Sequence, residues 1–470
     1  MTINTNTATL LEQKSTDELK AKVKGQVFTP GDEGYDRARM AWNLSVSQYP
    51  AVVMFASDAA DIIEGVRFAR QVDLGVAVQA TGHGVIRPAN DCLLINTSQM
   101  NSVRVDPDSR TAWVEAGAKW GRVLEAASVF GLAPLLGSSP DVGAVGYTLG
   151  GGLGWLARKY GLSTDSVCAI DLVTADGQRV HASQDENSDL FWGLRGGGGG
   201  FGVVVGMEIQ LYPVSTVFGG NLIYPVEMAS DVIARYRDWI ETIPDEFTTS
   251  FAIMNYPPLP MVPEFLRGKS FIMVRGCYCG AVEEGQAYLQ DWLDWRAPVA
   301  NMFQEMPFSQ AATISNDPVD PVPGVASGAW LHELSDDAIQ TLVDYGVSVQ
   351  GSSPVLQTEV RHVGGAMGRA SRVENAFGHR DHSLLLEMVG MAPTPEAKSY
   401  VQEFIGRFKD ALSPSLTGGV YMNFLEGEEA HRRTRDGYPP EIYKRLMALK
   451  AEYDPENLFR FGFDIPPLKS

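Results

Sequence analysis

Apolar residues in the first half of the chain mostly follow the spacing of short strands, interrupted by a few stretches with helical spacing. Apolar or alternating runs predict strands at residues 49–55, 75–80, 92–96, 103–106, 111–116, 167–174 and from 201 to about 214. Apolar positions three and four residues apart predict helices at 58–72 and 120–129, and Ser57 is the expected N-cap of the first.

The middle of the chain carries fewer signals of the same two kinds. Helical spacing recurs at 233–239 and 283–295, and apolar runs predict strands at 271–275 and 383–389. The proline-rich segment 316–324 is expected to be an exposed loop that borders the entrance of a site. Both halves together predict an α+β fold.

Glycine is concentrated in one stretch, residues 137–162, where it alternates with apolar residues. Because glycine has no side chain and reaches positive φ without strain, such a run marks backbone that another group approaches closely. A large flat or anionic ligand is the expected group, with a tight turn between packed strands as the alternative. The pattern Gly152-Leu-Gly154-Trp-Leu-Ala157 also fits a dinucleotide-binding fingerprint. We reject a nicotinamide cofactor bound in this way, because the motif needs a strand entering it, a helix leaving it and a βαβ unit around it.

A second candidate for ligand binding follows the strand predicted at 75–80. That strand leads directly into Thr81-Gly82-His83-Gly84, in which one histidine stands between small residues. A lone histidine is often only a hydrogen-bonding residue of the core, but its glycine neighbours favour a ligand here.

Composition and charge exclude several classes of function. The 470 residues carry a formal net charge of -19 that is spread along the chain, so nucleic acid is not an expected partner. Cys92, Cys168, Cys277 and Cys279 form no disulfide or zinc-binding pattern and are expected to be reduced. The polar N-terminus, 1–14, lacks the apolar core of a signal peptide, and no apolar run is long enough to span a bilayer. We therefore expect a cytoplasmic protein that contacts neither membrane nor nucleic acid, with no metal site, as a monomer or homodimer.

Four motifs in one order carry a family resemblance. They are residues 81–84, 137–162, the segment 189–204 with its five consecutive glycines, and Tyr453-Asp-Pro-Glu-Asn-Leu-Phe-Arg460, which closes on Ile465-Pro-Pro467. Together they resemble the berberine-bridge-enzyme-like branch of the vanillyl-alcohol-oxidase superfamily, which has a PCMH-type FAD domain. Among its members the chain is most similar to bacterial ones such as 6-hydroxynicotine oxidase.

The resemblance implies a domain order and a cofactor. It places a lead-in at 1–45, a two-part FAD-binding domain at 46–216, a substrate domain with an antiparallel sheet backed by helices at 217–412, and a segment that returns to the FAD domain at 413–470. In the family, the histidine that matches His83 carries the flavin covalently through the 8α-methyl group. Imidazole suits this role because it is a nucleophile at neutral pH. The implied flavin contacts are His83, Thr81, Gly82, Gly84, Gly137, Ser138, Ser139, Val142, Gly143, Gly146, Tyr147, Gly150, Gly152, Gly154, Val204 and Asn423.

Departures from the family pattern matter for the chemistry. Ser139 stands where many members have a cysteine that forms a second bond to the flavin, so we predict a single link. Gln79 and Asp464 also replace residues of the family pattern. Val142 matches a small residue that leaves room for O2 beside the flavin, which favours an oxidase. Phe424 replaces the second tyrosine of a Tyr-x-Asn-Tyr motif that can act as a base.

The candidate catalytic residues are therefore Tyr421, Asn423 and Glu387. Gln357, Glu359 and His382 are further polar residues on strand-like segments, although a solvated or ion-paired role is the more common one for such residues.

The resemblance implies a ping-pong oxidation, in which a hydride passes from the substrate to flavin N5 and O2 reoxidises the flavin to H2O2. The predicted substrate is a small aromatic or secondary-metabolite molecule that undergoes C–O or C–N oxidation or oxidative cyclisation. Two alternatives remain open: a carbohydrate oxidase, which Ser139 and Phe424 disfavour, and a flavin-bearing binding protein without turnover.

Overall fold

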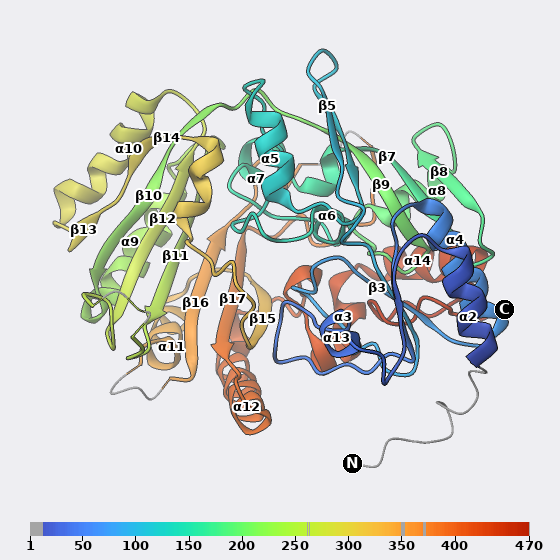
Figure 1. The fold of residues 1–470 in the computed structure, drawn as a ribbon. Helices are drawn as coiled ribbons and strands as arrows, with labels where there is room; N and C mark the ends of the chain where they lie inside the picture. The colour runs from blue at the N-terminus through green and yellow to red at the C-terminus, as the bar shows by residue number, and fades with distance from the viewer. Residues whose placement is uncertain (1–12, 261, 263, 349–352, 370–372, 470) are drawn as a thin grey trace.

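The computed structural model describes residues 13–469 except 261, 263, 349–352 and 370–372. The expectation about a signal peptide concerns the N-terminus, of which residues 1–12 lie outside the described residues. Three sheets organise the chain (Figure 1). The first has the strand order β1-β2-β4-β3, with β2–β4 and β3–β4 parallel. Its elements are α2 (Gln13–Lys22), β1 (Val27–Phe28), α3 (Tyr35–Ala38), β2 (Val52–Phe55), α4 (Ala59–Gln71), β3 (Val76–Gln79) and β4 (Leu93–Asn96).

The second sheet is antiparallel and has the order β5-β6-β9-β7-β8. Its elements are β5 (Val103–Asp106), β6 (Thr111–Glu115), α5 (Trp120–Ser128), α6 (Ala144–Leu149), α7 (Ala157–Tyr160), η1 (Ser163–Ser166), β7 (Val167–Val173), β8 (Arg179–Ser183), α8 (Ser188–Leu194) and β9 (Val203–Gln210). The glycine-rich stretch 137–162 contains only the short helices α6 and α7. Because no strand enters it, the rejection of a βαβ nicotinamide-cofactor motif is confirmed.

The third sheet has eight strands in the order β13-β10-β12-β11-β16-β17-β15, with β14 paired to β10. Its elements are β10 (Thr216–Pro225), η2 (Val226–Met228), α9 (Ala229–Ile240), β11 (Phe247–Asn255), β12 (Ser270–Tyr278), α10 (Val282–Trp295), β13 (Ala300–Asn301), β14 (Gln304–Pro307), η3 (Phe308–Ile314), β15 (Gly324–Leu331), α11 (Asp336–Gly346), β16 (Val355–His362), β17 (Leu384–Met391) and α12 (Pro395–Leu412). Apolar side chains on one face, such as Phe251, Val274 and Leu386, form a core with α9, α10, α11 and α12. Because side chains alternate along a strand, the polar residues between these apolar ones lie on the opposite face of the sheet.

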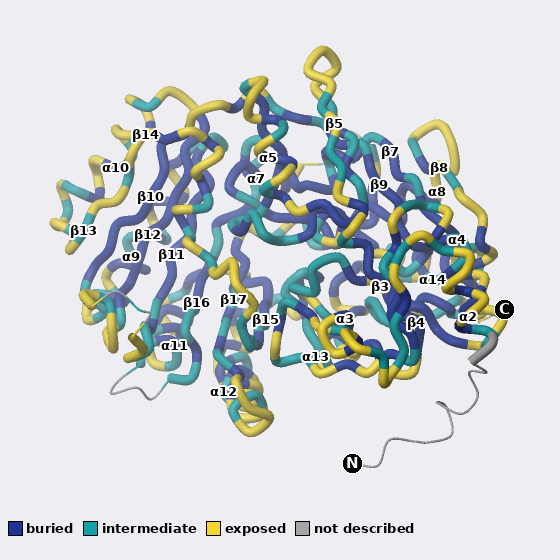
Figure 2. The backbone as a smooth tube through the Cα atoms, viewed as in Figure 1, coloured by how far each residue is buried: buried dark blue, intermediate teal, exposed yellow. Residues whose placement is uncertain are grey.

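The C-terminal segment returns to the first two sheets, as Figure 1 shows in red. It contains η4 (Ser413–Ser415), η5 (Met422–Phe424), α13 (Gly427–Arg433), η6 (Thr434–Gly437) and α14 (Pro440–Tyr453). The backbone N–H of Val76 in β3 donates to the Leu458 carbonyl oxygen at 2.9 Å. The buried Lys450 ammonium donates to the Gly200 carbonyl oxygen at 2.7 Å and pairs with Asp454 at 2.6 Å. Figure 2 shows the central strands of the sheets largely buried, whereas β5, β8, β13 and β14 are more exposed.

The predicted α+β class is confirmed, and one local expectation is wrong. Asp58, not Ser57, caps α4, because its carboxylate accepts from the backbone N–H groups of Ala60 and Asp61. Tyr421 stands directly before the single turn η5. All four cysteines lie in the described ranges and are free thiols, as expected. In the described part of the chain, no helix is both long and apolar enough to cross a membrane.

Candidate active site

His83 lies just past the end of β3 and is held on two sides. Its Nδ1 is 2.9 Å from the Thr81 hydroxyl, and the Trp42 ring stacks on the imidazole with centroids 4.1 Å apart and planes 15° from parallel. The Trp42 backbone N–H donates to the Thr81 carbonyl oxygen at 3.0 Å, so the lead-in segment fixes this turn. Gly82 has φ +79°, and a side chain there would overlap Ala41.

The second ring nitrogen of His83 is buried and unused. Nε2 has no hydrogen-bond partner among the described residues, and its nearest charged group is the Asp141 carboxylate at 3.9 Å. Burial lowers the pKa of His83 to about 4, and Asp141 only partly opposes this shift. The imidazole is therefore neutral at physiological pH, and its ring carries a nucleophilic lone pair.

The glycines of the predicted cradle fall into two groups. A side chain at Gly84 or Gly146 would meet no protein atom within 4 Å, so these two positions face open space. A side chain at Gly150, Gly152 or Gly154 would instead overlap other parts of the protein, respectively the carboxamide of Asn423, the side chains of Ser163 and Tyr147, and the Leu136 backbone. The second group therefore permits close packing within the chain, a role that the sequence pattern does not distinguish from ligand contact.

The other predicted flavin contacts have varied surroundings. Gly143 packs near Thr81, and Gly137 lies against the Tyr147 ring. The Tyr147 hydroxyl is buried without a partner among the described residues, and burial raises its pKa well above the usual value. Four members of the set remain. The Ser139 hydroxyl accepts from the Asp141 N–H at 3.3 Å, and Ser138 lines a small pocket. Val142 is half-buried against the core of the second sheet, and Val204 is buried in β9 opposite Leu172.

Tyr421 and Asn423 connect the C-terminal segment to the glycine stretch. The Tyr421 hydroxyl accepts from the Gly152 N–H at 3.0 Å and from the Asn423 carboxamide at 3.1 Å. The same Asn423 Nδ2 donates to the Tyr147 carbonyl oxygen at 2.9 Å. Burial raises the pKa of Tyr421 to about 12. At neutral pH this phenol is protonated and occupied, so it suits a positioning role better than that of a base.

The face of the third sheet opposite the helices carries a buried ionic network. Glu359 accepts from Ser250 at 2.6 Å and from the guanidinium groups of Arg275 and Arg361 at 3.3 and 3.2 Å. Arg361 also binds Glu387 at 2.7 Å. Gln357 donates to Glu359 at 3.1 Å. Thus three residues predicted from the sequence, Gln357, Glu359 and Glu387, lie in one network, whereas His382 lies outside it.

The two carboxylates of this network titrate in opposite directions. Glu359 is surrounded by cations, which hold its pKa below the usual value despite burial. Burial raises the pKa of Glu387 to about 7, with Arg361 opposing this shift and Glu359 adding to it. The strand register explains the repulsion, because Glu359 and Glu387 are direct cross-strand partners. Glu387 can therefore gain or lose a proton near neutral pH.

A small pocket joins the sheet to the glycine stretch. Its lining includes Ser138, Gly154 and Trp155 on one side and Ser250 and Arg361 on the other. The Arg361 guanidinium lies 5.1 Å from the centroid of the Phe424 ring. The ionic network and the cradle thus face a common region, as the candidate active site requires.

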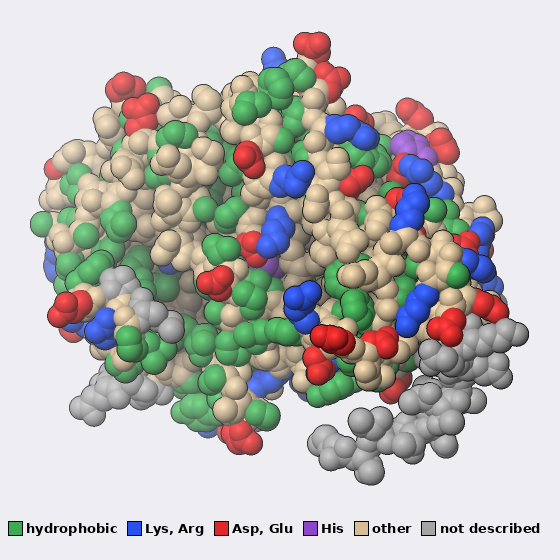
Figure 3. Space-filling model, viewed as in Figure 1, with side chains coloured by type: hydrophobic (Ala, Val, Ile, Leu, Met, Phe, Trp, Pro, Cys, Tyr) green, Lys and Arg blue, Asp and Glu red, His purple; other side chains and the backbone are tan. Residues whose placement is uncertain are grey.

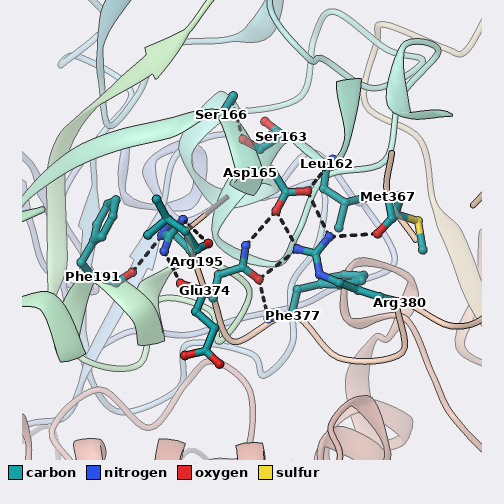
Figure 4. Close-up of polar contacts among 12 residues, drawn as sticks. Leu162, Ser163, Asp165, Ser166, Phe191, Arg195, Met367, Glu374, Phe377 and Arg380 are labelled. Atoms are coloured by element: carbon teal, nitrogen blue, oxygen red, sulfur yellow. Dashed lines mark hydrogen bonds and ion pairs between the residues drawn. The ribbon is translucent and has the colours of Figure 1, made fainter. Parts of the chain in front are cut away.

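Two residues of the site are absent from the sequence predictions. Trp42 lies in the lead-in segment, and a tryptophan alone gives no signal of stacking. Arg361 continues the every-second-residue polar pattern of β16, and this pattern is the sequence signal that indicates it. An ion pair, shown in Figure 4, connects the segment before β17 to η1. Arg380 donates two hydrogen bonds to Asp165, of 2.6 and 3.1 Å.

The described residues fit a bound flavin. The open glycines Gly84 and Gly146 leave a space that a side chain would fill, and the unpaired buried atoms, His83 Nε2 and the Tyr147 hydroxyl, are the kind that a ligand satisfies. A neutral imidazole, a bare peptide cradle and an ionic sheet face together define a flavin-dependent oxidoreductase.

Comparison with known proteins defines the family further. Residues 50–183 match the model of the FAD binding domain, and residues 420–466 match the model described as berberine and berberine like. An uncharacterized FAD-linked oxidoreductase of Bacillus subtilis, YgaK, is 30% identical over 96% of this chain and 98% of its own. The (R)-6-hydroxynicotine oxidase of Paenarthrobacter nicotinovorans is 28% identical over 95% and 97%. The chain belongs to the berberine-bridge-enzyme-like FAD-linked oxidoreductases and is an FAD-dependent oxidase.

A solved structure supports the fold. The structure of a chitooligosaccharide oxidase matches 97% of this chain and 100% of the oxidase chain, with a TM-score of 0.84 and 24% identity. At this identity the match bears on the fold alone. The chain is thus similar both to a protein named for hydroxynicotine and to one named for chitooligosaccharides, so the family does not determine the substrate class.

Proposed function

We propose that this oxidase holds FAD through one covalent bond, from a ring nitrogen of His83 to the flavin 8α-carbon, and oxidises a small aromatic molecule that carries an O–H or N–H group. The observation that supports the link is the buried, neutral imidazole of His83, which has one unpaired nitrogen and precedes the open Gly84. Ser139 stands where a second link would need a thiolate, which supports a single bond.

FAD, when bound, accepts a hydride from the substrate and passes the electrons to O2, which gives H2O2. The chain supplies the remaining parts of the reaction. Glu387 takes the proton from the substrate O–H or N–H, since its pKa is near neutral. Arg361 holds the Glu387 carboxylate at 2.7 Å and thereby fixes its direction. Phe424, beneath the Arg361 guanidinium, offers an apolar face to an aromatic ring.

A carbohydrate oxidase is the second candidate, favoured by the relatives that carry such names. The polar groups of Gln357 and Ser250 on the sheet face are able to bond sugar hydroxyls. Against this candidate, the Gln357 and Ser250 side chains already donate to Glu359, and Phe424 offers no hydroxyl.

Two experiments test the proposal. Acid precipitation of the purified protein should leave the yellow colour in the pellet, whereas His83→Ala should release it to the supernatant. Release of all flavin from the wild type would refute the covalent link without affecting the substrate assignment. Peroxide release is then measured with a panel of hydroxynicotines, phenols and oligosaccharides. Turnover of oligosaccharides alone would favour the second candidate, and a flat response with retained colour would indicate a flavin-bearing protein without turnover.

A further inference from the structure

Three of the seven histidines lie outside the site described above and gather at one place, where β15 ends and the chain leads into β17. One ligand atom from each of His379, Asp381 and His382 lies within 4.8 Å of the other two. The His332 ring, just past the end of β15, lies 6.5 Å from the His382 ring between centroids. The cluster therefore joins the end of β15 to the segment that leads into β17.

Other contacts orient the two central histidines. Nε2 of His379 donates to the Asp436 backbone carbonyl oxygen at 2.7 Å, a bond that fixes the tautomer and leaves a lone pair on Nδ1. A hydrogen bond from the non-ligating nitrogen to a carbonyl is the usual outer support of a metal-bound histidine. The His379 ring also packs against Gly419, where a side chain would overlap it. His382 stacks on His379 at 5.3 Å with the planes 12° apart, and its ring lies 5.7 Å from that of Trp330.

The charge around the cluster suits a cation. Asp381 is 82% exposed and lies 3.9 Å from Nδ1 of His382. Arg380, between the two histidines in sequence, is drawn away because its guanidinium binds Asp165 and the Met367 carbonyl oxygen (Figure 4). The positive charge of Arg380 is thus neutralised elsewhere, and the Asp381 carboxyl group lies beside the histidines.

We propose that His379, Asp381 and His382 bind a divalent transition-metal ion of the zinc class, with His332 as a fourth ligand. Imidazole nitrogen and carboxylate oxygen are ligands that Zn²⁺ and its neighbours accept, whereas Ca²⁺ and Mg²⁺ require oxygen. Bonds of about 2.0–2.1 Å bring ligand atoms to roughly 3.3 Å of one another, so the side chains close inward by rotation when the ion binds. The ion ties the start of β17, the strand that carries Glu387, to the end of β15.

The test uses tag-free holoenzyme, because a histidine tag would bind the same metals. Zn²⁺ affinity is measured by competition with a chromogenic chelator, and Co²⁺ is added as a spectroscopic probe whose bands lie to the red of the flavin. We expect one equivalent of Zn²⁺ bound, and at least an approximately tenfold weaker affinity in His379→Asn and in His382→Ala. Asparagine suits position 379, since His379 has φ +57° and asparagine tolerates this region.

A matched control distinguishes a site from general binding by histidine. His181 also lies beside a carboxylate, with Nδ1 2.7 Å from Asp171, but among the described residues it belongs to no group of three possible ligands. His181→Ala should therefore leave the affinity unchanged. Asp381→Asn, at an exposed side chain, serves as a second variant that leaves the fold intact and should also weaken binding. The proposal is overturned by a wild type that binds no stoichiometric Zn²⁺, by unchanged affinity in the cluster variants, or by an equal loss in the His181 control.

Discussion

Replacement of Glu387 by glutamine should lower activity and raise stability, each with its own pH dependence. Relative to 4.5 in an unfolded chain, the folded-state pKa of about 7 means that folding favours the protonated acid. Burial of the charged carboxylate therefore costs folding free energy. This cost is absent well below pH 4.5, grows as the pH rises, and is complete above about 7. At about 1.4 kcal/mol per unit, the buried charge costs about 3 kcal/mol at high pH.

The amide removes this cost but also weakens the bond to Arg361. That bond contributes about 1–2 kcal/mol, and Arg361 keeps its second partner, Glu359. We therefore expect Glu387→Gln to raise the free energy of unfolding by about 1–2 kcal/mol at pH 8.5, with the gain vanishing toward pH 5. Loss of the base should reduce the rate of flavin reduction by roughly 10²–10⁴-fold. The wild-type rate should rise with pH through an inflection near 7, which the variant lacks.

Flavin reduction is followed by anaerobic stopped-flow absorbance with a substrate from the panel, and stability by urea unfolding at several pH values. Glu426→Gln is the matched control, because burial raises the pKa of Glu426 to about 7 as well, yet this carboxylate bonds the Ala326 N–H and not Arg361. The control should keep the inflection in the rate. A Glu387→Gln enzyme that reduces its flavin at the wild-type rate, or whose stability gain over the wild type is no larger at pH 8.5 than at pH 5, would refute this reasoning.

Three further outcomes are expected. Gly146→Ala should fold normally but bind FAD at least about tenfold more weakly, because position 146 faces open space. Gly150→Ala should instead lower thermal stability, because a side chain there overlaps Asn423. Titration with FAD and thermal melts distinguish the two outcomes. Asp165→Asn should cost about 3–5 kcal/mol in urea unfolding, since it leaves a largely buried guanidinium unpaired, and a cost below 1 kcal/mol would contradict the stabilising role of this ion pair. Trp42→Ala should lower the acid-stable flavin fraction while Trp42→Phe retains it, because the stacked ring holds His83; equal fractions in both variants would argue against stacking.

Local patterns in the sequence determine the fold class and indicate the ligand site of this protein. The spacing of apolar residues predicts the α+β class, because side-chain periodicity reports which face of a strand or helix is buried. The glycine stretch and the lone histidine after β3 indicated a ligand, since both depend on backbone freedom and side-chain chemistry within a few residues.

The tertiary structure decided which of those residues do what. Gly146 and Gly150 are indistinguishable in sequence, and only the approach of Asn423, more than 250 positions later, assigns one to packing and leaves the other open. Likewise, Glu387 acquires a near-neutral pKa because the register of β16 and β17 places Glu359 opposite it and burial excludes water. Long-range contacts set these properties, because desolvation and charge pairing depend on neighbours in space that no local pattern encodes.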